Sequence, residues 1–101
     1  MVYKLERITH TGRKGIAGTE RTDGRYPIRK GSLYDIDFGM LKVGNSFPLK
    51  YLKDNQGYEK FGYMVTSIVI EIQKPTDDEL VIRTLNSKYH LRKYGNNENE
   101  T

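Results

Sequence analysis

Basic side chains able to bind an anion are concentrated near the end of the sequence. Arg83, Lys88 and Arg92 lie within residues 80–94 together with His90, and this stretch contains no Asp or Glu. Guanidinium and ammonium groups bind phosphate and carboxylate oxygens, and histidine gains or loses a proton near neutral pH. A charged sheet face is usually solvated and sometimes binds a partner, which for these four side chains would be phosphate or an acidic protein.

These side chains share a surface if residues 80–94 form a tight β-hairpin. Asn86 and Ser87 are residues typical of turns, so we expect them to form its two-residue loop. The resulting register produces one apolar face and one basic face. It places Ile82 opposite Leu91 and Thr84 opposite Tyr89 on the apolar face, and Val81 opposite Arg92, Arg83 opposite His90 and Leu85 opposite Lys88 on the basic face.

A second group of cations lies in residues 10–30, a glycine-rich stretch that we interpret as a long loop or a ragged hairpin. Gly12 to Gly15 match the GXXG loop with which KH domains clamp nucleotides, but that loop joins two helices and the flanking residues show no helical pattern. A flexible basic loop could fold around a phosphate backbone or an acidic protein surface, or could be a merely soluble connection. Its cations are Arg13, Lys14, Arg21, Arg25, Arg29 and Lys30.

The charge of the whole chain supports an acidic partner. Seventeen Lys and Arg against thirteen Asp and Glu give a net charge of +4, and the excess is uneven. Residues 1–30 hold eight cations and three anions, whereas residues 80–95 hold four cations and no anion. This asymmetry favours nucleic acid as the first candidate partner.

Aromatic residues interleaved with cations are typical of proteins that stack single-stranded bases. The chain has eight tyrosines and three phenylalanines but no tryptophan, and Tyr26 lies beside Arg25. We expect Tyr26, Tyr58 and Tyr94 to be exposed, whereas the hairpin register turns Tyr89 inward.

Residues suited to catalysis are few. Asp35 and Asp37, two apart on a predicted strand, could serve acid–base chemistry or a divalent metal, but a solvated strand face is the simpler and preferred interpretation. The acidic residues 77–79 follow Pro75 and are typical of a turn. The absence of cysteine excludes thiolate nucleophiles and disulfides. We therefore expect a non-enzymatic protein without a metal or cofactor.

Length and hydropathy predict one domain over residues 1–95, followed by a polar, disordered tail over residues 96–101. No apolar run reaches the roughly 18 residues of a membrane span, and residues 1–10 do not resemble a secretory signal. These features, with the lack of cysteine, lead us to expect a cytoplasmic protein.

Alternation of polar and apolar residues predicts strands over residues 2–9, 32–38 and 63–73, and a short edge strand within residues 41–52. We expect a bulge or an end twist near Arg7, because Tyr3 and Leu5 lie on one face and Ile8 on the other. In the meander that joins residues 63–73 to the final hairpin, Ile72 should face Leu80 and Ile70 should face Ile82. The predicted centre of the core is Ile68, Ile70, Ile72, Leu80, Ile82 and Leu91.

These elements predict an all-β fold, a five- or six-stranded antiparallel barrel or sandwich of the SH3-like or OB-like kind with a C-terminal hairpin. Several segments share a pattern with other small proteins: Val43-Gly44, Leu49, Tyr51, Val65 to Ser67, Glu71-Ile72 and Thr84 to Tyr89. In these segments the chain resembles uncharacterised small proteins encoded by phages and mobile elements of Gram-positive bacteria. The resemblance implies a setting in which small proteins often inhibit host defence, as anti-CRISPR proteins do, or regulate DNA.

Two functions follow as hypotheses. The first is an accessory or inhibitor protein that docks on a nucleic-acid-handling protein; the second is a direct DNA or RNA binder. A hydrolase that uses Asp35 and Asp37 is a weaker third. We expect the loop cations to make the recognition contacts and the hairpin cations to support them, so the candidate partner-binding residues are Arg13, Lys14, Arg21, Arg25, Tyr26, Arg29, Arg83, Lys88 and Arg92.

Overall fold

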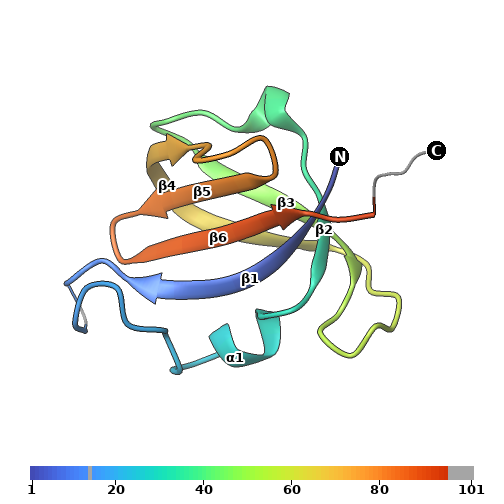
Figure 1. Cartoon of the computed structure of the whole chain (residues 1–101), viewed down its shortest axis with the longest axis horizontal. Helices are drawn as coiled ribbons and strands as arrows, with labels where there is room; N and C mark the ends of the chain where they lie inside the picture. Colours follow the sequence, from blue (N-terminus) through green and yellow to red (C-terminus); the bar gives the residue numbers. More distant parts are fainter. Residues whose placement is uncertain (14, 96–101) are drawn as a thin grey trace.

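Six antiparallel strands close into a barrel (Figure 1), in a computed structural model that describes residues 1–13 and 15–95. Each strand pairs with the next and β6 returns to β1, which confirms the predicted small all-β barrel. The sequential order is that of an up-and-down barrel rather than a Greek-key OB barrel. The elements are β1 (Val2–His10), α1 (Tyr26–Arg29), β2 (Leu33–Asp35), η1 (Phe38–Met40, a 3₁₀ turn), β3 (Ser46–Lys53), β4 (Tyr63–Gln73), β5 (Glu79–Thr84) and β6 (Ser87–Lys93). Lys14 and the predicted disordered tail fall outside the described residues.

The core fills the barrel with side chains from every strand. Because successive residues of a strand point to opposite faces, every second residue enters the interior. Burial raises the pKa of Tyr34, and it raises that of Tyr89 to about 12, so both phenols stay neutral. The buried hydrophobic residues of this core are Tyr3, Leu5, Ile8, Tyr34, Ile36, Leu41, Phe47, Leu49, Tyr51, Met64, Val69, Leu80, Ile82, Tyr89 and Leu91.

A bulge in β1 lies where the sequence predicts it. The pairing of β1 with β6 shifts register between Leu5 and Arg7. The inserted residue turns Ile8 to the same side as Tyr3 and Leu5, and all three are buried. The bulge is therefore confirmed, whereas the opposite orientation expected for Ile8 is wrong.

The strand β4 has the predicted bounds but not the predicted inner face. Met64 and Val69 are buried, whereas Ile68 is 50% and Ile70 is 41% exposed. The pairing with β3 shifts before Pro48, and the pairing with β5 shifts after Val69, so the alternation changes phase along β4. A one-residue slip inverts both faces, and the assignment of Ile68 and Ile70 to the core is therefore wrong. Ile72 packs partly buried against the core.

The C-terminal hairpin forms, with its register two residues away from the predicted one. Its turn is at Leu85 and Asn86, and Ser87 already belongs to β6. A two-residue slip preserves the faces, so Tyr89 still points inward, but the predicted partners are wrong. The observed pairs are Ile82 with Tyr89, Leu80 with Leu91, Val81 with His90, Arg83 with Lys88 and Glu79 with Arg92, while Ile72 pairs with Ile82.

The strand β3 is not an edge strand, which corrects the interpretation of Pro48. It pairs with β2 on one side and β4 on the other, and closure leaves no edge in this part of the barrel. Pro48 lies where the β3–β4 register shifts, a place where a missing N–H donor is tolerated.

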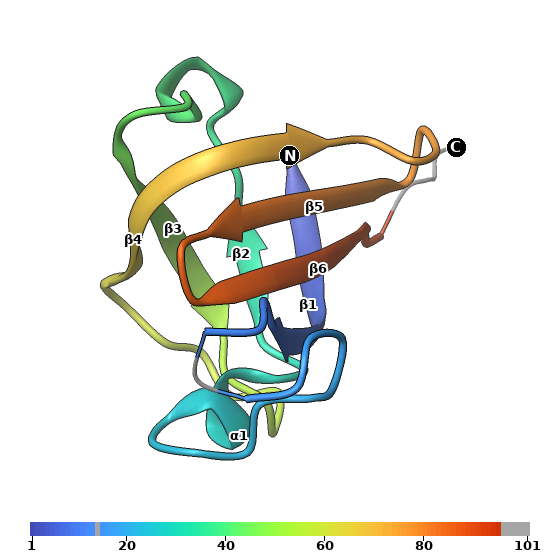
Figure 2. The ribbon, with the colours of Figure 1, turned by 90° about the vertical axis from the view of Figure 1, so that its left-hand side faces the viewer.

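The segment between β1 and β2 folds back under one end of the barrel, with α1 beside it (Figure 2). The backbone of His10 donates to the Thr19 carbonyl at 2.8 Å, and that of Arg21 donates to the Ile8 carbonyl at 2.7 Å. The predicted ragged hairpin is therefore present next to the end of β1.

Candidate functional site

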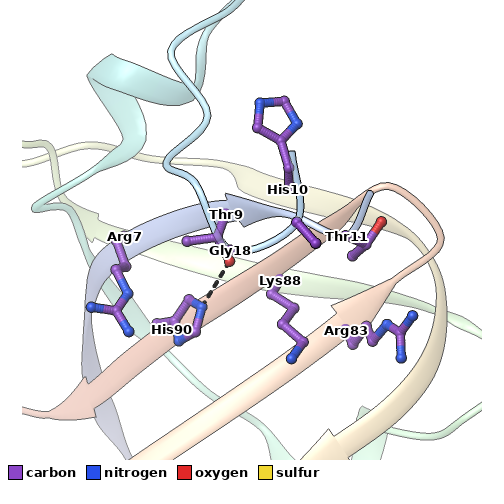
Figure 3. Close-up of a pocket in the computed structure, with 9 residues that line it drawn as sticks. Arg7, Thr9, His10, Thr11, Gly18, Arg83, Lys88 and His90 are labelled. Carbon is purple, nitrogen blue, oxygen red and sulfur yellow. Dashed lines mark hydrogen bonds between the residues drawn. The ribbon is translucent and has the colours of Figure 1, made fainter. Parts of the chain in front are cut away.

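A cationic pocket lies on the outside of the barrel, where β1, β5 and β6 meet the segment after β1 (Figure 3). Its volume is about 250 Å³, and no Asp or Glu is among its lining residues. We call it the cationic pocket. The side chains that matter for its chemistry are Arg7, Thr9, His10, Arg83, Lys88 and His90.

Strand pairing brings these side chains together. Arg83 faces Lys88 across the β5–β6 hairpin, and Arg7 faces His90 across β1 and β6. Arg83 and Lys88 are like charges directly opposite one another, an unfavourable arrangement in a sheet. An anion placed between these two cations would relieve their repulsion, so the arrangement is suited to anion binding.

The cations of the pocket are only weakly neutralised. The Arg83 Nη1 atom lies 3.7 Å from a Glu71 oxygen, and no ion pair within residues 1–13 and 15–95 involves Arg7 or Lys88. A buried polar atom at the pocket, Arg83 Nε, also has no hydrogen-bond partner in that part of the chain. Buried polar groups are rarely left unsatisfied, which makes this atom a candidate for a ligand contact.

The glycine-rich segment closes over His10. A Cβ atom on Gly15 would come within 2.7 Å of the His10 ring, so a larger residue here would displace that ring. Gly15 does not line the pocket itself, but it packs against His10, which does.

The protonation state of His90 is sensitive to a bound anion. Its Nε2 atom lies 3.0 Å from the Thr9 hydroxyl oxygen. Burial, followed by the charges of Arg7 and Lys88, lowers the pKa of His90, while Glu6 and Glu79 oppose this effect. The ring is therefore neutral at pH 7, and a bound anion would favour its protonation.

Arg92, a predicted partner-binding residue, lies outside the cationic pocket. Its guanidinium forms ion pairs with Glu79 at 3.0 Å and with Glu6 at 3.3 Å. The expectation of a hairpin face without a carboxylate is therefore wrong, because β1 and the start of β5 both supply one. Arg92 has less charge to offer a partner than Arg83 or Lys88.

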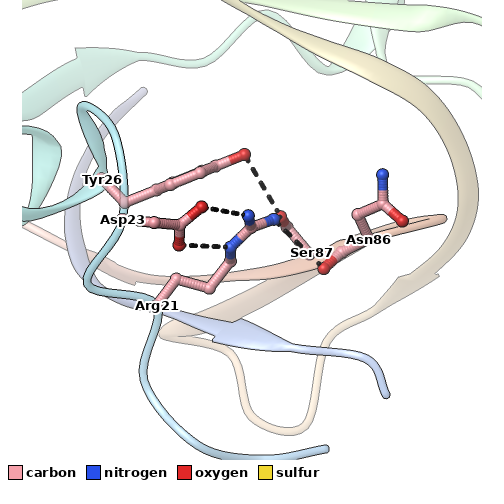
Figure 4. Close-up of polar contacts among 5 residues, drawn as sticks. All are labelled: Arg21, Asp23, Tyr26, Asn86 and Ser87. Carbon is pink, nitrogen blue, oxygen red and sulfur yellow. Dashed lines mark hydrogen bonds and ion pairs between the residues drawn. The ribbon is translucent and has the colours of Figure 1, made fainter. Parts of the chain in front are cut away.

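Arg21 is a buried structural residue and not an exposed loop cation (Figure 4). Its Nε and Nη2 atoms donate to Asp23 at 3.1 and 2.6 Å, and Nη1 donates to the Ser87 hydroxyl at 2.8 Å. The guanidinium carbon lies 4.2 Å from the Tyr26 ring centroid. The bidentate contact lowers the pKa of Asp23 and raises that of Arg21. These contacts attach the segment after β1 to the tip of the β5–β6 hairpin.

The other predicted site residues are dispersed. Arg13 is exposed, and Lys14 lies outside the described residues. Tyr26 is partly buried and packs against the core, which corrects its expected exposure, whereas Tyr58 and Tyr94 are exposed as predicted.

Arg25 and Arg29 line a second cavity of about 280 Å³ between α1 and the β3–β4 connection. We call it the aromatic cavity, because Phe61 and Tyr63 also line it and are 87% and 61% exposed. The sequence prediction missed these two rings, although the alternation of Lys60, Phe61, Gly62 and Tyr63 carried a signal for them.

The two predicted catalytic carboxylates make local contacts. Asp35 accepts a hydrogen bond from the Met1 amino group, and Asp37 accepts one from the Gly39 backbone N–H at the start of η1, both at 2.9 Å. In the described residues, no three side chains of His, Asp or Glu are grouped so that they could hold a metal ion. Nor do these residues include a helix long and apolar enough to cross a membrane.

Fold and site together define a small antiparallel β-barrel with a cationic pocket on its outer surface. No family model, curated protein or solved structure matches the chain.

Proposed function

We propose that the protein is a non-enzymatic nucleic-acid-binding barrel that holds backbone phosphate in the cationic pocket. The observation that carries this proposal is the cross-strand placement of Arg83 opposite Lys88, with Arg7 in the same pocket and no carboxylate lining it. Phosphate contacts supply most of the affinity of proteins that bind nucleic acids without sequence preference.

The pocket offers several kinds of phosphate contact. Arg83 and Arg7 can present guanidinium N–H groups, Lys88 supplies a compact charge, and protonation gives His90 a positive charge and a second N–H donor. These groups lie on paired strands, so they lose less conformational entropy on binding than a mobile loop would. The geometry therefore favours the second of the two functions expected from the sequence.

Fluorescence anisotropy with labelled DNA and RNA oligonucleotides, titrated at several salt concentrations, tests the proposal. Neutralising two cations in Arg83→Gln/Lys88→Gln should weaken binding and reduce the slope of log affinity against log salt by about 0.9 per lost duplex phosphate contact. Arg92→Gln is the matched control, since Arg92 is already paired with two carboxylates. Binding with an unchanged salt slope in the double variant would remove the cationic pocket from the interface.

A second candidate function is that of an accessory or inhibitor protein docked on a nucleic-acid-handling protein. Aliphatic side chains exposed on the outer face of β4 favour it: Val65, Ile68 and Ile70 are 61%, 50% and 41% exposed. Exposed apolar surface often marks protein interfaces. The phage or mobile-element setting rests on the sequence resemblance alone.

Affinity capture from a bacterial host lysate tests this second function. An inhibitor should bind little nucleic acid on its own and should retain a nucleic-acid-handling protein. That retention should be lost in Ile68→Ser/Ile70→Ser and kept in Arg83→Gln/Lys88→Gln. Equal retention by both variants would exclude β4 as the docking surface.

A further inference from the structure

We propose that the aromatic cavity is a stacking site for unpaired bases of single-stranded nucleic acid. The inference rests on the proposed function, and it names the class of nucleic acid that the barrel prefers. Its basis is the pairing of exposed rings with cations around one cavity, on the β3–β4 side of the barrel and separate from the lining of the cationic pocket.

The local backbone presents both rings to solvent. Gly62, at φ +94°, adopts a conformation that glycine favours, and its carbonyl accepts a hydrogen bond from the Tyr51 N–H at 2.9 Å. Phe61 therefore lies just before the point where the chain joins the barrel, and Tyr63 is the first residue of β4. Because Met64 enters the core, Tyr63 must point outward. Tyr63 is therefore fixed to a strand of the barrel, Phe61 lies two residues before it, and both rings are largely exposed.

The walls of the cavity carry positive charge. Arg25 and Arg29 come from the α1 region, Lys60 comes from the opposite connection, and no Asp or Glu is among the lining residues. The Lys60 Nζ atom lies 4.3 Å from the Tyr51 ring centroid, a cation–π distance that keeps the ammonium beside the cavity. Cations on both walls would hold the phosphates of a strand whose bases contact Phe61 and Tyr63.

This combination selects a single strand over a duplex. Rings stack on the flat faces of bases, and those faces are covered inside a double helix. An acidic protein is the less favoured occupant, because the aliphatic residues suited to a protein interface lie further along β4, at Ile68 and Ile70.

The test uses single-stranded oligonucleotides that contain 2-aminopurine, whose fluorescence is quenched when the base stacks, and a duplex of the same sequence. Wild-type protein should change the fluorescence of the single strand and bind it more tightly than the duplex. Phe61→Ala and Tyr63→Ala should each raise the single-strand Kd about fivefold or more and abolish the fluorescence change, with the salt slope unchanged. Tyr58→Ala is the matched control, because Tyr58 is 68% exposed but does not line the cavity.

The outcomes separate this inference from the proposed function. Equal affinity for single strand and duplex, or a Phe61→Ala/Tyr63→Ala variant that binds like wild type, overturns the stacking site and leaves phosphate binding intact. If the aromatic variants lose capture of a host protein while single-strand binding is unaffected, the cavity is a protein interface and the inference is wrong. Absence of binding to every oligonucleotide overturns the proposed function, and the stacking site with it.

Discussion

At the scale of single residues, His90 links pH to stability. Its pKa is lowered because burial disfavours the protonated ring and because Arg7 and Lys88 repel it. As the pH falls through the ordinary histidine range around 6.5, the unfolded chain takes up a proton that the folded chain resists. We expect the melting temperature to fall between roughly pH 7 and pH 5, and His90→Gln to reduce that fall.

Thermal unfolding followed by circular dichroism over this pH range checks the prediction. A bound oligonucleotide should diminish the effect in wild type, because phosphate near Arg7 and Lys88 favours the imidazolium. His10→Gln is the control for general loss of a histidine. If wild type and His90→Gln lose stability in parallel, His90 does not carry the pH dependence.

The composition of the cationic pocket was only partly predictable. Arg83, Lys88 and His90 are close in sequence, and a hairpin pattern identified their common face. Arg7 and His10 join them through pairing of β1 with β6, a contact across almost the whole chain that local alternation cannot reveal.

At the scale of elements, Arg21 holds the segment after β1 against the hairpin tip. Arg21→Met should lower the free energy of unfolding by about 1.5–3 kcal/mol, the usual contribution of hydrogen bonds to a charged group. Urea unfolding measures this loss. Arg21→Lys keeps the charge without the bidentate geometry and should recover only part of it. Wild-type stability in Arg21→Met would show that the segment is held by other contacts.

Along β4 the alternation of inward- and outward-facing residues changes phase, and this change gives a second prediction at the scale of elements. Met64→Ala removes a side chain that is 2% exposed and should lower the free energy of unfolding by about 2–5 kcal/mol. Ile70→Ala, at a position 41% exposed, should lower it by less than about 1 kcal/mol. Urea denaturation of both variants compares them directly. A loss in Ile70→Ala as large as that in Met64→Ala would place Ile70 in the core and remove the phase change.

Features of the strands could be predicted from the sequence where they depend only on the alternation of polar and apolar residues over a few positions. The bounds of β4 and the bulge in β1 follow from the order of residues, because both are expressed within a few positions. The register of the final hairpin could not be predicted in this way. Ser87 belongs to β6, and its hydroxyl accepts a hydrogen bond from Arg21, a residue far away in sequence. The outward turn of Ile68 likewise depends on how β4 pairs with β3.

At the scale of the whole molecule, the question is where the excess positive charge acts. Arg13→Glu/Lys14→Glu and Arg83→Glu/Lys88→Glu each replace two positive charges with two negative ones, so both take the net charge from +4 to 0. The general attraction between protein and polyanion is therefore reduced equally in the two variants. Any difference in nucleic-acid affinity between the two variants therefore depends only on where in the molecule the charges were reversed.

We expect the Arg83→Glu/Lys88→Glu protein to lose nucleic-acid binding and the Arg13→Glu/Lys14→Glu protein to retain most of it. The physical reason is that the hairpin cations are held opposite each other on paired strands, in a pocket without a lining carboxylate. Anisotropy titrations at matched salt measure both affinities, and melting curves confirm that both variants fold. The reverse ranking would transfer recognition to the glycine-rich segment, as the sequence alone led us to expect. Equal, small losses in both would mean that the charge acts only at long range and that the cationic pocket holds no phosphate.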